Sequence, residues 1–256
     1  MQSENSDNPK VNIQDLLEAG VHFGHLRSKW NPKMAPYIFM EKNGIHLVDL
    51  NKTAMKLDEA VSAMRNIARS GRKILFVATK KQAKEIVTEC AKRVNMPYVT
   101  DRWLGGMLTN FATVRKSIKK MSNIDKMNAD GTVENMAKRE RLMLGREREK
   151  LDRILGGIND LTRLPAALFI VDIKKEHIAV AEAHKLGLTS FGIVDTNADP
   201  SDVDFAIPGN DDATKSIALI TNIITNAIEE GLNDRKKSKD DTETVDSEQE
   251  TVPSEQ

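Results

Sequence analysis

Three unbroken apolar stretches of strand length constrain this fold more than any other feature of the sequence. They span residues 73–79, 166–173 and 189–194, and each has a stretch with helical spacing beside it. Strands without polar alternation are typical of sheets that are buried on both faces, and their alternation with helices indicates parallel pairing. The sequence therefore predicts an α/β fold in which helices cover a parallel sheet.

Weaker patterns supply the rest of this domain. Asn43-Gly44 predicts the turn of a hairpin over 37–50, because a type I′ turn needs positive φ at both central positions. Short strands are expected at 97–100 and 203–207, and helices at 11–19, 52–70, 81–94, 176–186 and 213–232. Together these elements place the α/β domain at 11–108 and 164–233.

The stretch 109–163 breaks this alternation. It carries two helical runs, at 110–128 and 133–160, in which apolar residues recur at spacings of three and four. These residues are Val114, Ile118, Met121 and Ile124 on the first run and Leu144, Leu151, Leu155 and Ile158 on the second. A seam this narrow predicts an antiparallel coiled-coil helical hairpin, inserted into the sheet domain and projecting from it as an arm.

The net charge of zero conceals segments of opposite sign. Residues 240–256 hold seven acidic side chains and no Lys or Arg, so the other 239 residues carry an excess of seven positive charges. Within 102–163, 14 Lys and Arg stand against 8 Asp and Glu. A basic body of this kind suggests a nucleic-acid partner. We expect a disordered leader at 1–10 and a disordered acidic tail at 234–256.

Several classes of protein are excluded by composition and motifs. The single cysteine, Cys90, cannot form an internal disulfide, which favours the reducing cytoplasm. No run approaches about 18 apolar residues, so no transmembrane helix is expected, and the polar N-terminus lacks a secretory signal. The glycine-rich phosphate loops of nucleotide-binding enzymes and the G-x-S-x-G turn of hydrolases do not occur.

Two loops and one helix carry the candidate RNA-binding residues. Lys and Arg can neutralise phosphates, and an aromatic ring among them can stack on a base. The first loop holds Arg27, Lys29, Trp30 and Lys33, the second holds Arg102 and Trp103, and the arm's first helix holds Arg115, Lys116, Lys119 and Lys120. The alternative explanations are a solvated charged face and Trp side chains that fill the core.

One histidine and two aspartates are candidate metal ligands. Asp195 and Asp211 follow predicted strands, at the carboxyl edge where doubly wound sheets bind ligands, and His25 follows the first helix. An imidazole and two carboxylates could hold a structural divalent ion. Helix capping and hydrogen bonds to loop amides explain the same residues more simply, so no cofactor is expected.

Six motifs follow one another along residues 11–232 in the order of a known family. They are Gly20-Val-His-Phe-Gly-His25, Trp30-Asn-Pro-Lys-Met34, Arg102-Trp-Leu-Gly-Gly-Met-Leu-Thr-Asn110, Leu155-Gly-Gly-Ile158, Ile193-Val-Asp-Thr-Asn-Ala-Asp-Pro200 and Ile207-Pro-Gly-Asn-Asp-Asp212. Through these motifs the sequence resembles the bacterial small-subunit ribosomal protein S2 family. The resemblance implies a flavodoxin-like parallel sheet with a coiled-coil protrusion, and no catalytic activity.

The resemblance also implies a function. The protein would be a structural constituent of the small ribosomal subunit in the cytoplasm, bound to its rRNA between head and body. Its neighbours would include ribosomal protein S1, which the family helps to recruit and which holds mRNA. The main alternative is an α/β enzyme or regulator that binds a sugar phosphate or nucleotide, because the scaffold hosts many functions. A third possibility is a protein-binding surface centred on the arm.

Overall fold

A five-stranded parallel sheet forms the centre of the protein. The computed structural model describes residues 11–249, with side chains up to residue 237 except at 134 and 135, so the predicted leader at 1–10 lies outside the described residues. The strands are β4 (Ile74–Val77), β5 (Tyr98–Val99), β6 (Ala167–Val171), β7 (Thr189–Val194) and β8 (Phe205–Pro208). Their order, β5-β4-β6-β7-β8, and their parallel pairing confirm the predicted α/β class. Flavodoxin-like doubly wound sheets have the same order.

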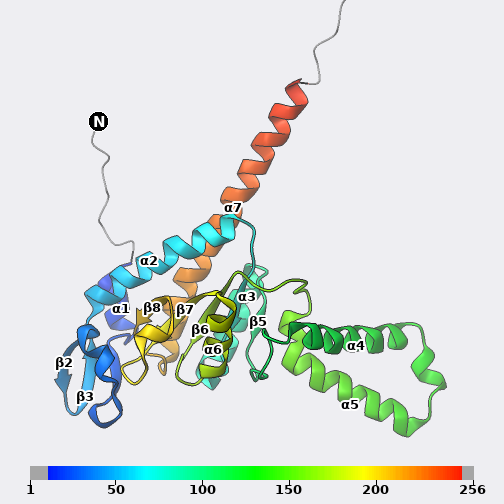
Figure 1. The fold of residues 1–256 in the computed structure, drawn as a ribbon, viewed down its shortest axis with the longest axis horizontal. Helices are drawn as coiled ribbons and strands as arrows, with labels where there is room; N and C mark the ends of the chain where they lie inside the picture. Colours follow the sequence, from blue (N-terminus) through cyan, green and yellow to red (C-terminus); the bar gives the residue numbers. More distant parts are fainter. Residues whose placement is uncertain (1–10, 250–256) are drawn as a thin grey trace, which may run out of the picture.

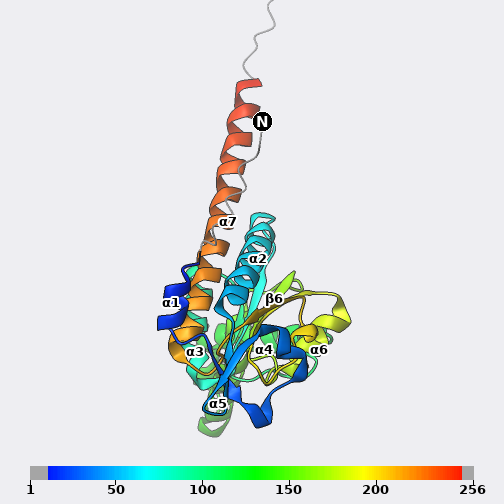
Figure 2. The same ribbon diagram turned by 90° about the vertical axis from the view of Figure 1, so that its left-hand side faces the viewer.

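Both faces of this sheet are buried. Ile74 and Phe76 of β4 point into one core, while Leu75 and Val77 point into the other. Helices α1 (Ile13–Glu18), α2 (Leu50–Arg69), α3 (Lys81–Arg93) and α7 (Thr214–Gln249) cover the first face, and α6 (His177–Leu186) lies on the second (Figure 2). This two-sided burial explains why the strands show no polar alternation.

A small antiparallel sheet lies beside the large one. Its strands are β1 (Phe23–Leu26), β2 (Ile38–Lys42) and β3 (Ile45–Val48), in the order β1-β3-β2. The predicted hairpin is the β2–β3 pair, with Asn43 (φ 53°) and Gly44 (φ 75°) in its turn. Strand β1 was not predicted. It depends on a close approach to Thr196, because a Cβ at Gly24 would lie 2.5 Å from Thr196 Cγ2.

Two helices, α4 (Phe111–Ala129) and α5 (Lys138–Leu155), form a hairpin that projects from the sheet domain (Figure 1). The short helix η3 (Thr132–Asn135) connects them, so α5 begins later than the predicted start at 133. Of the predicted seam, Ile118, Met121 and Ile124 are buried. At the base, Leu155 and the following short helix η4 (Gly156–Ile158) join the second core, which anchors the hairpin in the domain.

Helix α7 is longer than expected. It runs to Gln249, whereas its predicted end is at 232, and residues 250–256 of the predicted disordered tail lie outside the described residues. No Gly or Pro interrupts the chain between Gly231 and Pro253, so no stop signal ends the helix earlier. Arg65 of α2 donates a hydrogen bond to Asp234 at 2.8 Å, just beyond the expected end. No helix in residues 11–249, α7 included, is long and apolar enough to cross a membrane.

The contact between α2 and α7 is tightest at Gly231, where a Cβ would lie 2.5 Å from the carbonyl oxygen of Arg65. We expect Gly231→Ala to lower the free energy of unfolding by about 1–2 kcal/mol, because overpacking against backbone outweighs the gain in helix propensity. Urea denaturation followed by circular dichroism measures the change.

The matched control is Gly145→Ala in α5, where a Cβ would meet nothing within 4 Å. This variant should gain up to about 1 kcal/mol from helix propensity alone. A gain of stability in both variants would contradict the tight packing of α2 on α7.

Candidate nucleic-acid interface

The four basic residues predicted on the arm's first helix divide into two pairs. The Arg115 guanidinium donates to a carbonyl oxygen just beyond η4, and Lys120 pairs with Glu147 of α5. Both side chains therefore hold the hairpin together. Lys116 and Lys119 are exposed on α4, and their side chains form no ion pair or hydrogen bond within the described part of the chain. This second pair is available to a phosphate.

One carboxylate organises the loop that leads into α4. Glu182 of α6 is 7% exposed and accepts hydrogen bonds from the backbone N–H groups of Gly106 (2.7 Å), Leu108 (2.9 Å) and Thr109 (3.0 Å). It also accepts one from Nε1 of Trp103, at 3.1 Å. Hydrogen bonds to an ionised carboxylate are strong, so Glu182 fixes the root of the arm.

Trp103 braces this loop, and its burial contradicts the predicted stacking on RNA. The side chain is 6% exposed within the second core, and its indole N–H is committed to Glu182. A side chain this buried leaves almost no surface for a base, so the alternative of a core-filling Trp holds here. Arg102, one residue earlier, is exposed and stays a candidate.

The pKa of Glu182 is set by two opposed effects. Burial alone would raise the pKa. The backbone N–H groups of Thr109 and Leu108, the Trp103 indole and the Gly106 N–H together outweigh burial and lower the pKa below its ordinary value. Because the pKa is lower in the folded than in the unfolded chain, the charge of Glu182 stabilises the fold at neutral pH.

The predicted basic loop lies over the carboxyl edge of the large sheet, on the short helices η1 (Arg27–Lys29) and η2 (Pro32–Tyr37). The Asn31 N–H donates to the carbonyl oxygen of Thr196, and the His25 N–H donates to the Thr196 hydroxyl, each at 2.8 Å. Thr196 follows β7, so these bonds hold the loop on that edge. The Trp30 ring is 36% exposed and lies 5.1 Å from the ring of His46.

Two cations of this loop have acidic partners. Lys33 Nζ lies 2.6 Å from Asp199 Oδ2, and an Arg27 guanidinium nitrogen lies 3.3 Å from Glu41 Oε2. The hydrogen bond to Asp199 raises the pKa of Lys33. The Lys33 and Arg27 side chains are 62% and 72% exposed, so these ion pairs are weak and can exchange for a phosphate. Lys29 is exposed as well.

An ion network fills the carboxyl edge beneath the loop. Lys80, which follows β4, places its Nζ 2.7 Å from Asp211, 2.6 Å from Asp212 and 3.2 Å from Asp172. The aspartates come from the ends of β6 and β8, so the topology alone brings them to one lysine. The edge at which doubly wound sheets bind their ligands is thus closed by side chains of the protein itself.

The three predicted metal ligands meet at this edge, joined by a fourth residue. His25 Nδ1 lies 2.9 Å from Asp195 and His25 Nε2 lies 3.4 Å from Asp212. The ligand atoms of His25, Asp195, Asp211 and Asp212 all lie within 4.8 Å of one another. One imidazole and three carboxylates form a donor set that a divalent ion such as Zn²⁺ accepts. Lys80 already supplies positive charge to two of these carboxylates.

Carboxylates outnumber cations in this network, and the pKa values reflect the imbalance. Burial first, and then the charges of Asp172 and Asp195, raise the pKa of Asp211 to about 7. Burial alone would lower the pKa of Lys80, but its aspartate neighbours, Asp211 foremost, raise it. The hydrogen bond to Asp195 raises the pKa of His25. This network therefore has no surplus of positive charge for a sugar phosphate or a nucleotide.

Comparison with known proteins settles the family. The family model described as Ribosomal protein S2 matches residues 16–231. The chain belongs to the ribosomal protein S2 family. Membership makes it a structural constituent of the ribosome and not an enzyme, which excludes the sugar-phosphate or nucleotide enzyme considered above.

Relatives named "Small ribosomal subunit protein uS2" match this S2-family chain over nearly its whole length. That of Cytophaga hutchinsonii is 65% identical over 240 residues, covering 94% of both chains. That of Flavobacterium johnsoniae is 61% identical over 231 residues, covering 90% of this chain and 91% of the relative. That of Parabacteroides distasonis is 61% identical over 236 residues, covering 92% of this chain and 85% of the relative.

Sequence reasoning missed Glu182 and Lys80 in this S2 protein. Glu182 lies on α6 one turn after Ala179, which is buried, and an acid on the apolar face of a helix was the available signal. Lys80 directly follows the apolar run 73–79, and its position at the carboxyl edge was the signal for a partner among the aspartates there. The partners of both residues lie in segments that are distant from them in sequence.

We expect Glu182→Gln to lower the free energy of unfolding at pH 7 by about 1–3 kcal/mol, because an amide cannot replace the charge that the N–H donors hold. The lowered pKa sets the direction with pH. The difference between wild type and variant should be complete above the unfolded pKa of about 4.3 and disappear as pH falls through the lower folded value.

Urea denaturation at pH 7 and at about pH 3.5 measures both effects. Glu85→Gln is the matched control, because Glu85 is exposed on α3, and it should change stability by less than about 0.5 kcal/mol at either pH. A difference for Glu182→Gln that does not depend on pH would argue against its charge as the stabilising factor.

Proposed function

We propose that this S2-family chain is a structural protein of the small ribosomal subunit that binds the subunit's rRNA between head and body. The observation that carries the proposal is the pair Lys116 and Lys119, exposed and one turn apart on a helix that stands away from the sheet domain (Figure 1). The name shared by the relatives supports an assignment to the small subunit. The protein then acts in the cytoplasm on the ribosome, with neighbouring ribosomal proteins as its other partners.

The chemistry of binding is neutralisation of phosphates, without turnover. Each Lys or Arg that contacts a phosphate releases condensed counterions, which supplies affinity that depends on salt. Arg102 adds charge at the root of the arm. The loop with Arg27, Lys29, Trp30 and Lys33 provides a second contact over the carboxyl edge, where the part-exposed Trp30 ring can stack on a base.

The arm serves this function as an antiparallel coiled coil in our proposal. Buried Ile118, Met121 and Ile124 repeat every three residues along α4 and support a narrow seam. Arg148 Nε lies 2.8 Å from Asp125 Oδ1 across the hairpin, beside the Lys120–Glu147 pair. Rigid packing would hold Lys116 and Lys119 at a constant distance from the domain.

Replacing the two exposed arm lysines tests the RNA contact. Lys116→Gln combined with Lys119→Gln should reduce the slope of log affinity against log salt by about 1.8, because each phosphate contact contributes about 0.9. Filter binding of the full-length protein to small-subunit rRNA over a salt series measures this slope. The free energy of unfolding should be unchanged, since neither side chain has a partner in the described residues.

Lys185→Gln combined with Lys215→Gln is the matched control. Both lysines are exposed, on α6 and near the start of α7, so this variant loses the same charge away from the arm. Equal salt slopes for the two double variants would contradict the arm contact.

We also infer that the small antiparallel sheet is the surface that helps to recruit ribosomal protein S1. Phe23 of β1 and Met40 of β2 both pair with Leu47 of β3, so the three side chains form a row on one face. Phe23 and Met40 are 50% and 46% exposed, and Phe39 is 71% exposed. Grouped exposed apolar side chains are typical of protein interfaces.

Phe23→Ser combined with Met40→Ser should leave the protein on small subunits but deplete ribosomal protein S1 from them. Sucrose gradients of cell extracts, probed for both proteins, measure the two amounts. Leu142→Ser combined with Met143→Ser is the control, because it removes two exposed apolar side chains from α5. Normal amounts of S1 with the Phe23 and Met40 variant would contradict this surface.

A further inference from the structure

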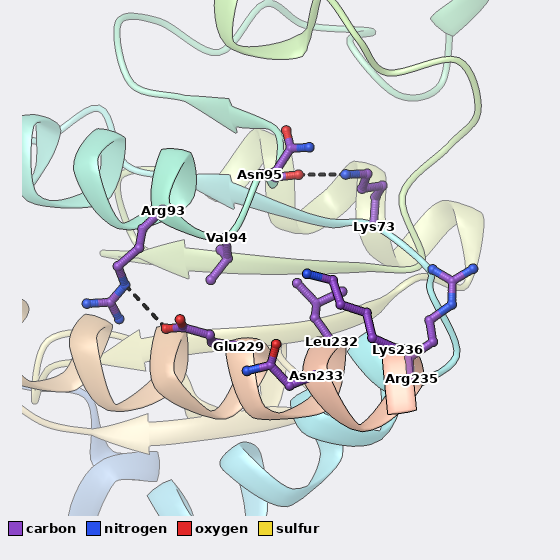
Figure 3. A pocket seen from close by; sticks show the side chains of 9 residues that line it. All are labelled: Lys73, Arg93, Val94, Asn95, Glu229, Leu232, Asn233, Arg235 and Lys236. Atoms are coloured by element: carbon purple, nitrogen blue, oxygen red, sulfur yellow. Dashed lines mark hydrogen bonds and ion pairs between the residues drawn. The ribbon is translucent and has the colours of Figure 1, made fainter. Parts of the chain in front are cut away.

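A basic pocket lies at the amino edge of the large sheet, opposite the edge covered by the loop of Arg27 and Lys33. The pocket has a volume of ≈ 390 Å³ and lies between the residue before β4, the end of α3 and the middle of α7 (Figure 3). Four cations line it, from three elements of the fold: Lys73, Arg93, Arg235 and Lys236. None of them belongs to the motifs or candidate sites described above.

We propose that this pocket binds phosphate groups of the RNA backbone, as a contact separate from the arm and from the basic loop. The pocket contact rests on one part of the proposed function, namely that the chain binds rRNA.

The local structure holds these cations in place. Lys73 Nζ donates to the carbonyl oxygen of Asn95 at 2.6 Å. The Arg235 guanidinium lies against Gly71, in the space that a side chain there would enter, and the φ of +75° at this position favours glycine. Lys236 extends along the pocket from α7, with its amine directed toward the centre (Figure 3). Cations that are already positioned lose little conformational freedom when a phosphate binds.

The charge of the wall favours a phosphate over a neutral organic ligand. Val94 and Leu232 are its apolar residues, and the other seven lining residues have charged or amide side chains. Glu229 is the single carboxylate of the lining, and it lies 3.8 Å from Arg93 Nε, so it offsets one of the four cations. The net positive charge and the N–H donors of Lys and Arg suit phosphate oxygens.

A second concavity favours a polymer over a free anion. It has a volume of ≈ 240 Å³, shares Lys73 and Asn95 with the first pocket, and continues to Gly157 and Asp160 at the root of the arm, with Lys92 on its wall. Two adjoining hollows that share a lysine can take successive phosphates of one strand. A single free anion needs only one of them.

Helix capping does not account for the whole cluster. Lys92 and Arg93 lie in the last turn of α3, where a cation complements the helix dipole. Lys73, in contrast, precedes a strand, and Arg235 and Lys236 lie within α7, whose last residue is Gln249. The presence of these three side chains around one hollow therefore needs a different explanation, which a polyanionic partner supplies.

The test uses the full-length protein and small-subunit rRNA. Arg93→Gln combined with Lys236→Gln should weaken binding about tenfold at roughly 0.15 M salt and reduce the salt slope by about 1.8, the effect of two lost phosphate contacts. Lys185→Gln combined with Lys215→Gln again serves as the control of equal charge. The loss should add to that of the Lys116 and Lys119 variant, because the two sites share no partner.

Asn233→Asp provides a second variant, which adds a negative charge to the pocket and removes none of its basic side chains. Asn233 is exposed on the pocket wall, so a carboxylate there should repel phosphates and weaken rRNA binding. Asn51→Asp, exposed on α2, is its control. Thermal unfolding of each variant, followed by circular dichroism, confirms that the binding data refer to folded protein.

Three results would overturn the proposal. If both pocket variants bind rRNA like their controls while the arm variant is weakened, the pocket is not an RNA contact and the proposed function stands. If the pocket variants lose binding of inorganic phosphate but still bind rRNA like their controls, the pocket is a site for free phosphate. If wild type itself fails to bind rRNA, the proposed function fails first.

Discussion

The burial of β4, β6 and β7 on both faces is the constraint on which the rest of this structure depends. The rings of Phe76 and Phe169 meet edge to face at 5.5 Å in one core, while Leu75 and Leu168 of the same strands are buried in the other. Because neither face can contact water, every connection between strands must either cover a face or leave the domain. The connection from β5 to β6 does both. Its base completes the second core, and its two helices then project beyond the core.

Burial also separates the charges that hold the fold together from those left for a partner. An ionised group inside the protein needs compensating charges or hydrogen bonds, because its desolvation costs several kcal/mol. Glu182 finds four N–H donors, and Asp211 finds Lys80. Lys116 and Lys119 remain hydrated on the surface and need no partner to be tolerated there. The pattern of partners, more than the density of charge, distinguishes residues that brace the protein from residues that can bind RNA.

Local sequence patterns predicted most of the fold, whereas contacts between distant segments could not be predicted from the sequence. The apolar runs, the Asn43-Gly44 turn and the seam of the arm are patterns within a few residues, and each was predicted. Lys119 and Lys120 are chemically identical neighbours, yet only the register of α5 decides that Lys120 meets Glu147. Trp103 is withdrawn from solvent by a carboxylate 79 residues away. The site therefore depended on pairings that spacing along the chain cannot reveal.

The closed carboxyl edge explains how this scaffold can serve a ribosomal protein. Sheets of this strand order bind ligands in the crevice beyond the carboxyl ends of the strands, where glycine-rich turns admit a phosphate. Here a lysine follows β4, and three aspartates surround it. These side chains leave no surplus of positive charge for a phosphate at the place where an enzyme would hold it. The contacts with a polyanion that we propose lie at the periphery: on the arm, on the exposed loop above the edge, and at the amino edge. The strand order alone therefore left the function undecided, and the exposed cations at the periphery support the proposed one.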